Sequence, residues 1–216
     1  MVGSGRVFTL YTTPLSANGR KPLALCHALG LEPAIRLVNV YAGEGRSPEF
    51  LAINPLGKVP ALVDGGFRLV ESNALLVYIA EQHGGSRFFA AEPRARAEIL
   101  RWLFWEASAW QPALSAVLAP CVGHRLAPQH VPAPSAPPDW RSPQLAPLLA
   151  HLEAELARRA FLCGSELTIA DLSVAGMTTY FRYAGFPGAD WPNLAAWLAR
   201  IEALEPWKAS SDPLWR

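Results

Sequence analysis

The chain has few cysteines and no long apolar run. Its three cysteines, Cys26, Cys121 and Cys163, lie far apart in 216 residues. An odd number without CxxC or Cys/His spacing argues against a disulfide framework and against structural zinc, and it favours a reducing compartment. No apolar run approaches the roughly 18 residues of a membrane-spanning helix, and the N-terminus lacks a signal-peptide pattern. We therefore expect no metal, no membrane partner and a cytoplasmic location.

The chain also lacks an excess of one charge. Its 19 Lys and Arg balance 18 Asp and Glu, and the formal net charge is +1. The basic residues are scattered and form no stripe of the kind that nucleic acid requires, so we expect no nucleic-acid partner. Apolar residues make up 51% of the sequence. This is enough for the core of one large domain or two small ones.

The first part of the chain alternates between two patterns. Short apolar segments predict strands at residues 7–11, 35–40, 61–63 and 67–70. Segments with apolar residues at helical spacing predict helices at residues 20–29, 47–51 and 74–82. The order β-α-β-α-β-β-α predicts a parallel βαβ unit followed by an antiparallel hairpin. Together they would form a four-stranded mixed sheet with helices on its faces.

Strand patterns are absent from the second part of the chain. Helical patterns follow instead, at residues 93–118, 148–160, 169–183 and 194–204. A proline-rich segment at residues 127–147 predicts an irregular or polyproline-like loop of unassigned role. The predicted fold class is α/β plus all-α. We expect an α/β domain at residues 1–82, a linker at 83–92 and an all-helical domain at 93–216.

The segment NPLGKVPALVDG, residues 54–65, places Pro60 at the start of a predicted strand. An X-Pro bond adopts the cis form at a cost of only about 0.5–1 kcal/mol. A cis bond would turn the N–H and C=O of Val59 outward, where an extended peptide could pair with them. A trans proline at the first residue of a strand fits the spacing equally well.

Glu71 and Ser72 come directly before the next predicted helix. Ser72 suits an N-cap, and a helix N-terminus holds a small carboxylate through its free N–H groups and partial positive charge. Glu71 could pair with an ammonium group. The two residues would then hold the two charged groups of an amino acid. The alternative is an ordinary helix cap beside a solvated glutamate.

In combination, the element order, the G-K-V-P segment, the hairpin and the Glu71-Ser72 pair resemble the cytosolic glutathione S-transferases over essentially the whole chain. The resemblance implies a thioredoxin-like N-terminal domain, a C-terminal helical bundle domain, a cis bond at Pro60 and a homodimer. It implies glutathione as co-substrate, with its cysteinyl unit on Val59 and its γ-glutamyl end on Glu71 and Ser72.

Three further segments extend this resemblance. Lys58 stands where the family often contacts the glycyl carboxylate of glutathione, and Arg46 lies in a loop that commonly supplies another such contact. The segment SELTIADLSVAG resembles the helix-start signature of the family. In it Thr168 would cap the helix and Asp171 would close a capping box, which satisfies two N–H groups at once. We assign Asp171 a role in folding and none in catalysis.

The sulfur of glutathione needs a group that favours its thiolate. A thiol with a pKa of about 8.5 is only a few per cent ionised at neutral pH. A hydroxyl donor and a helix N-terminus would increase that fraction. The segment TTPLSANGRK offers Thr12, Thr13, Ser16 and Asn18, with Tyr11 before them, and resembles bacterial serine-type members with S-x-N.

Within that segment we expect Ser16 to be the catalytic donor, Asn18 to rank second and Tyr11 third. The alternative is that Ser16 or Asn18 only caps the helix. Because no cysteine occurs in this turn, a mixed disulfide on the protein is not expected. Trp105 and Trp110 are expected to line an apolar pocket for the electrophile, although aromatic residues at helical spacing occur more often in a core.

The sequence thus predicts a detoxification enzyme that binds glutathione and adds its thiolate to electrophilic small molecules. One alternative is a glutathione-dependent reductase whose second substrate is a disulfide or a peroxide. Another is a non-catalytic binding module that retains the fold. An intact Val59-Pro60, Glu71-Ser72 and Ser16 argue against the binding module. The sequence does not identify the second substrate.

Overall fold

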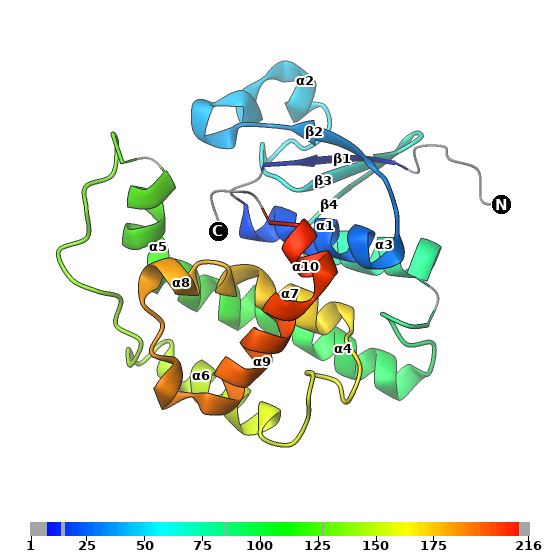
Figure 1. The fold of residues 1–216 in the computed structure, drawn as a ribbon. Helices are drawn as coiled ribbons and strands as arrows, with labels where there is room; N and C mark the ends of the chain where they lie inside the picture. The colour runs from blue at the N-terminus through cyan, green and yellow to red at the C-terminus, as the bar shows by residue number, and fades with distance from the viewer. Residues whose placement is uncertain (1–7, 14–15, 85, 127, 212–216) are drawn as a thin grey trace.

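The computed structural model describes residues 8–13, 16–84, 86–126 and 128–211. Residues 1–7, 14–15, 85, 127 and 212–216 lie outside the described ranges. They include parts of the predicted first strand, of both predicted domains, of the linker and of the proline-rich loop. Figure 1 shows a β-sheet at one end of the molecule and a larger group of helices at the other. The two parts are in contact through α1 (Ala17–Leu29) and α7 (Ile169–Thr178).

Four strands form one mixed sheet. They are β1 (Thr9–Thr12), β2 (Ala34–Leu37), β3 (Ala61–Asp64) and β4 (Phe67–Val70). Their spatial order is β2-β1-β3-β4, with β1 and β2 parallel and β3 antiparallel to both β1 and β4. Gly65, whose φ is 56°, lies in the β3–β4 turn. The predicted βαβ unit and hairpin are therefore confirmed.

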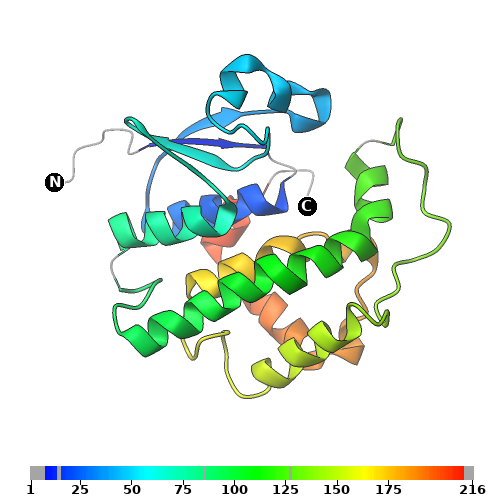
Figure 2. The same cartoon turned by 180° about the vertical axis from the view of Figure 1, so that it is seen from behind.

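Helices cover both faces of this sheet (Figures 1 and 2). α1 and α3 (Ser72–Ile79) lie on one face, while α2 (Pro48–Leu51) lies over the other. α1 ends as predicted at Gly30, which adopts the left-handed conformation with φ of 65°. It begins three residues earlier than predicted, at Ala17, because Ser16 acts as its N-cap.

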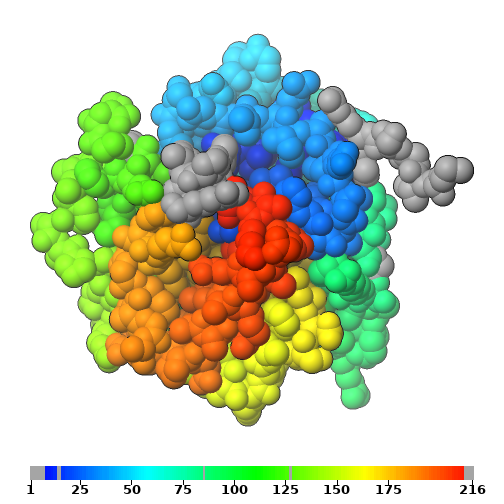
Figure 3. Space-filling model, viewed as in Figure 1, coloured from blue at the N-terminus to red at the C-terminus, as the bar shows by residue number. Residues whose placement is uncertain are grey.

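The second part of the chain is helical. Its elements are α4 (Pro93–Trp105), the π-helix η4 (Glu106–Trp110), α5 (Gln111–Leu126), α6 (Ala146–Leu156), α7, α8 (Phe181–Ala184), α9 (Pro192–Ala203) and α10 (Glu205–Ala209). The sequence patterns missed α10. Figure 3 shows this C-terminal helix, in red, lying against the blue N-terminal region. Within the described ranges, no helix has the length and hydropathy of a membrane span.

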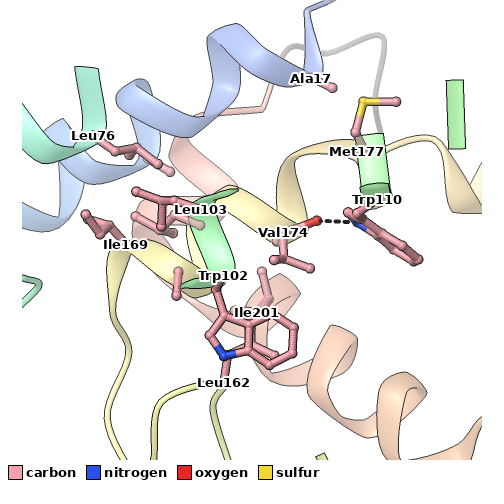
Figure 4. Close-up of a cluster of buried hydrophobic side chains, with 14 of the residues drawn as sticks. Ala17, Leu76, Trp102, Leu103, Trp110, Leu162, Ile169, Val174, Met177 and Ile201 are labelled. Carbon is pink, nitrogen blue, oxygen red and sulfur yellow. Dashed lines mark hydrogen bonds between the residues drawn. The ribbon is translucent and has the colours of Figure 1, made fainter. Parts of the chain in front are cut away.

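One hydrophobic cluster runs through both parts of the molecule (Figure 4). All ten residues of α7 are buried, so this helix forms the centre of the cluster. The Thr168 hydroxyl accepts the N–H of Ala170 at 3.3 Å, and Asp171 Oδ2 accepts the N–H of Thr168 at 3.0 Å, which confirms the predicted capping box. Asp171 Oδ1 also accepts from Trp197 Nε1 at 3.0 Å. The carboxylate thus fastens α9 to α7, and burial raises its pKa.

Candidate active site

The peptide bond between Val59 and Pro60 is cis, as predicted. Asn54 fixes the loop before it, since its side chain donates to the carbonyl of Lys58 at 2.6 Å and accepts the N–H of Leu56 at 3.0 Å. The N–H and C=O of Val59 make no hydrogen bond to another described residue. Buried or half-buried backbone groups are normally paired. These two groups therefore remain available to an extended ligand.

Glu71 has a φ of 71°, which is uncommon for a residue with a side chain. Strained conformations of this kind cluster at active sites and ligand-binding sites. Glu71 itself occupies the N-cap position of α3, and Ser72 is the first helical residue. The expectation that Ser72 is the cap was therefore wrong by one residue, because the unusual backbone of Glu71 starts the helix earlier. The Ser72 hydroxyl lies at the helix N-terminus, mostly buried, while Glu71 is exposed.

A buried polar network lies beneath Ser72. Lys21 Nζ donates to Ser72 Oγ at 3.4 Å and forms an ion pair with Glu106 Oε1 at 2.8 Å. Asn73 Nδ2 donates to Glu106 Oε2 at 2.9 Å, and the Ser173 hydroxyl donates to Asn73 Oδ1 at 2.7 Å. Burial lowers the pKa of Lys21, and the nearby Glu106 carboxylate opposes that shift. Sequence reasoning missed this network, since its members are scattered over four elements.

Ser16 lies at the N-terminus of α1. Its backbone is extended, with φ of −89° and ψ of 113°, and its Oγ accepts the N–H of Gly19 at 3.0 Å. The oxygen is thus an acceptor within the helix cap, while the hydroxyl hydrogen can be donated elsewhere. Two buried oxygens close to it in sequence, Thr12 Oγ1 and Asn18 Oδ1, have no hydrogen-bond partner among the described residues. Unpaired buried polar atoms are uncommon in folded proteins. The two oxygens in this turn are therefore available to hydrogen-bond a ligand.

Tyr11 is less well placed than Ser16. Its ring packs against Phe50 of α2, with 5.9 Å between ring centroids. α2 covers the face of the sheet opposite α1 (Figures 1 and 2). The body of the Tyr11 side chain therefore lies on the far side of the sheet from α1.

The two expected contacts to the glycyl carboxylate come from neighbouring loops. Lys58 and Arg46 are both exposed. A Cβ placed on Gly57 would lie 3.4 Å from Arg46 Nη1, so this guanidinium lies close to the residue before Lys58. Gly57 also has a φ of 67°, which disfavours any other residue there. The structure therefore places the Arg46 guanidinium close to the loop that carries Lys58.

Trp110 belongs to the hydrophobic core, and Trp105 packs against it. Trp110 is fully buried, and its Nε1 donates to the carbonyl of Val174 at 3.1 Å (Figure 4). Trp105 stacks on Trp110 with 5.5 Å between ring centroids and packs against the core cluster. Trp110 therefore does not line the expected electrophile pocket, because it has no accessible surface. Trp105 is only partly buried, so its place in that pocket stays a prediction.

The first turn of α1 is held by residues that sequence reasoning missed. The Tyr180 hydroxyl accepts the N–H of Ala17 at 3.3 Å. The Arg20 guanidinium donates to the carbonyl of Trp207 at 2.8 Å and to Ser210 Oγ at 3.1 Å. It also lies 3.9 Å above the Trp207 ring, and burial lowers its pKa to about 10. No local motif marks these contacts, because they join residues more than 160 positions apart.

Comparisons with known proteins agree with this geometry. The family model "Glutathione S-transferase, N-terminal domain" matches residues 6–81, and "Glutathione S-transferase, C-terminal domain" matches residues 138–200. Glutathione S-transferase F10 of Arabidopsis thaliana is 31% identical over 217 residues, which cover 95% of this chain and 96% of the relative.

Solved structures with the same fold include two glutathione transferases. A delta-class enzyme of Nilaparvata lugens has a TM-score of 0.83 and 26% identity, over 97% of this chain and 95% of that one. Glutathione transferase F2 of Populus trichocarpa has a TM-score of 0.81 and 27% identity, over 94% and 96% of the two chains. With matches of this extent in both sequence and structure, the protein belongs to the glutathione S-transferase family and is a glutathione transferase.

Proposed function

We propose that this glutathione transferase is of the serine type, with Ser16 as the group that stabilises the glutathione thiolate. The observation that carries the proposal is the position of Ser16 as N-cap of α1, a helix of 13 residues. The hydroxyl can donate to the sulfur while its oxygen stays fixed by the N–H of Gly19. The hydroxyl and the positive end of the helix both favour a negative charge at this point. Asn18, two residues further on, is the second candidate donor.

Glutathione is placed by its charges and its backbone. Its cysteinyl unit pairs with the N–H and C=O of Val59, as an added strand would. Its γ-glutamyl group binds Ser72 through the carboxylate and Glu71 through the ammonium group. Its glycyl carboxylate is held by Lys58 and Arg46. Three observations support this arrangement: the unpaired Val59 groups, the Ser72 hydroxyl at the N-terminus of α3, and the Arg46 guanidinium beside Gly57, the residue before Lys58.

The second substrate is an electrophilic small molecule that the thiolate attacks, a reaction suited to detoxification. The decisive assay gives purified protein and glutathione a chloronitroaromatic compound in one arm and a small disulfide in the other. Turnover of the aromatic compound, together with a bound-thiol pKa below about 8.5, supports the proposal. Disulfide reduction without aromatic turnover would instead assign the protein to the glutathione-dependent reductases.

The protein acts as a homodimer through one apolar surface, which we name the β4–α3–α4 surface. It surrounds a cavity of about 600 Å³ whose apolar lining includes Leu69, Val77 and Leu103. Phe67 and Phe104 at this cavity are 47% and 70% exposed. Exposed apolar groups of this size typically mark an interaction surface. A second copy of this chain is the partner that suits this surface. The surface carries both a cavity and exposed aromatic side chains, and these side chains can fill the cavity of the other copy. Light scattering of the parent and of Phe104→Glu tests this.

A cytoplasmic location and a two-domain division complete the proposal. Cys26, Cys121 and Cys163 are all unpaired, as is usual in a reducing compartment. The division at residues 83–92 is supported by the helix ends on either side, since the π-helix after α3 ends at Gly84 and α4 begins at Pro93. Cell fractionation tests the location. Limited proteolysis at the linker tests the division.

A further inference from the structure

Two consecutive residues of the helical domain hold the first turn of α1. Tyr180 accepts the N–H of Ala17 through its hydroxyl oxygen at 3.3 Å. Thr179 Oγ1 accepts a hydrogen bond from Arg20 Nη1 at 3.1 Å. Both residues lie in the short connection between α7 and α8. The helix end that carries Ser16 is therefore anchored to the other domain at two points within four residues.

The bond from Ala17 is the one closest to the proposed chemistry. Ala17 is the first residue of α1, and its N–H is one of the groups that a helix N-terminus leaves without an intrahelical partner. Ser16 already accepts the N–H of Gly19. Tyr180 thus supplies an acceptor to the residue that follows Ser16. This bond fixes where the start of the helix, and with it the Ser16 hydroxyl, points.

The surroundings of Tyr180 suit a fixed, neutral hydrogen-bonding group. Its side chain is 7% exposed and belongs to the main hydrophobic cluster. Figure 4 shows the same region, with Ala17 of α1 above Met177 of α7. Burial and, to a smaller extent, the charge of Tyr41 raise the pKa of Tyr180 to about 12, while the N–H of Ala17 opposes the shift. The phenol therefore stays uncharged over the pH range in which a thiol ionises.

We propose that Tyr180 is a positioning residue for thiol activation: its hydroxyl fixes the first N–H of α1, and so the helical domain sets how well Ser16 and the helix end stabilise the thiolate. This inference rests on the proposed role of Ser16. Tyr180 acts through Ala17 and Ser16. Its loss therefore changes the ionisation of bound glutathione more than the affinity for glutathione, whose other groups bind at Val59 and Ser72.

The test is Tyr180→Phe, which keeps the buried ring and removes only the hydroxyl. We expect kcat to fall about tenfold and the pKa of the bound thiol to rise by up to about one unit, because a tenfold rate loss and one pKa unit represent the same free energy. The KM for glutathione should change by no more than about twofold, which is small beside the tenfold fall in kcat. Thr178→Val is the matched control, since it also removes one buried hydroxyl, two residues before Tyr180, that donates to the carbonyl of Ala175 at 2.8 Å.

A second variant removes the hydrogen-bond donor, the N–H of Ala17, and keeps the acceptor, the hydroxyl of Tyr180. Ala17→Pro deletes the N–H at the first helical position, where proline is well tolerated. The extended backbone of Ser16 also suits a residue before proline. If the bond itself matters, Ala17→Pro should reproduce the rise in thiol pKa. The double variant with Tyr180→Phe should then show no further rise, because both changes remove the same interaction.

The outcomes separate this inference from the function on which it rests. A parent with a lowered thiol pKa, lost in Ser16→Ala but unchanged in Tyr180→Phe, overturns the role of Tyr180 and leaves the role of Ser16 intact. Equal effects in Tyr180→Phe and Thr178→Val also overturn it, since the change would then reflect a general loss of packing around α7. A parent without any lowered thiol pKa overturns both. Thermal unfolding of each variant shows whether it folds. If Tyr180→Phe does not fold, the bound-thiol pKa in Ala17→Pro alone decides whether the Tyr180–Ala17 bond matters.

Discussion

Lys21 Nζ lies 2.8 Å from Glu106 Oε1, and the two side chains are 0% and 1% exposed. The pair joins α1 to the π-helix η4, which follows α4. Taking two charges out of water is costly, and close contact with extra hydrogen bonds is needed to offset that cost. Here Ser72 and Asn73 supply those bonds. The buried polar network beneath the proposed γ-glutamyl site therefore also connects the two parts of the molecule.

Breaking this pair on one side should destabilise the protein strongly. Lys21→Met leaves the Glu106 carboxylate buried without its cation, which typically costs about 3–5 kcal/mol. Adding Glu106→Gln to Lys21→Met removes the second charge and should recover much of the loss. Urea denaturation of the two variants and the parent measures these differences. Arg101→Met is the control, since its partly exposed pair with Glu98 should contribute at most about 1 kcal/mol. A loss in Lys21→Met no larger than in this control would contradict the expectation.

Ser72→Ala should weaken glutathione binding without unfolding the protein. Loss of a hydrogen bond to a charged group typically costs about 1.5–3 kcal/mol, which is about 10- to 150-fold in affinity. The protein should stay folded but lose about 1 kcal/mol of stability, because the long bond that Lys21 Nζ donates to Ser72 Oγ at 3.4 Å is removed. No helix cap is lost, since Glu71 and not Ser72 occupies the N-cap position of α3. Isothermal titration calorimetry with glutathione provides the measurement.

Ser47→Ala is the matched control for that experiment. Ser47 caps α2, where its Oγ accepts the N–H of Phe50 at 3.3 Å. Its loss should cost about 1 kcal/mol of stability and leave glutathione affinity unchanged. If Ser72→Ala binds glutathione as tightly as the parent, the γ-glutamyl group is not held at this helix end.

The sequence predicted the elements that carry local signals. The β-α-β-α-β-β-α order followed from periodicity, and the end of α1 followed from Gly30, whose φ of 65° suits glycine. The capping box of Thr168 and Asp171 was equally visible, because its partners lie three residues apart. The cis bond at Pro60 was open on spacing alone and was favoured only through the family resemblance.

The remaining features depend on contacts between distant residues. The Lys21–Glu106 pair joins residues 85 positions apart, and the Tyr180–Ala17 bond joins residues 163 apart. Trp110 was assigned to a pocket because a stripe of aromatic residues at helical spacing looks the same whether it faces a cavity or a core. Only the position of α7 decides between the two. The start of α3 was misplaced by two residues and its N-cap by one, because no sequence rule anticipates a positive φ at Glu71.

The three cysteines should differ sharply in reactivity. Burial raises the pKa of the Cys26 and Cys163 thiols to about 12. At pH 8 only about one such thiol in ten thousand is ionised, and the thiolate is the reactive form. Cys121 instead lines a cavity of about 370 Å³ beside His124. Iodoacetamide at pH 8 should therefore label Cys121 in the native protein, and the other two only after unfolding, as read by peptide mass spectrometry.

The same shifts affect stability at high pH. A thiol whose folded-state pKa is raised favours the folded state fully below its unfolded pKa, near 9, and loses that contribution as the pH rises toward 12. We therefore expect stability to decline over this alkaline window. In Cys26→Ala the free energy of unfolding should fall less steeply with pH over this window, although the smaller side chain also leaves a cavity. Early labelling of Cys26 in the native protein would contradict its assignment to the core.

Ser16→Ala should lower turnover and leave the KM for glutathione nearly unchanged. One weak O–H···S bond contributes little to ground-state binding but acts directly on the nucleophile. The apparent pKa of the bound thiol, read from thiolate absorbance, should rise toward the free value of about 8.5. The lost N-cap should also cost about 1 kcal/mol of stability.

Ser16→Thr is the control, because threonine retains both the hydroxyl and the capping oxygen. It should keep a bound-thiol pKa close to that of the parent, unlike the alanine variant. If the pKa in Ser16→Ala stays at the parent value, Ser16 is only a helix cap. The same titration on Asn18→Ala then tests whether the amide group of Asn18, whose Oδ1 has no partner among the described residues, belongs to the thiol site.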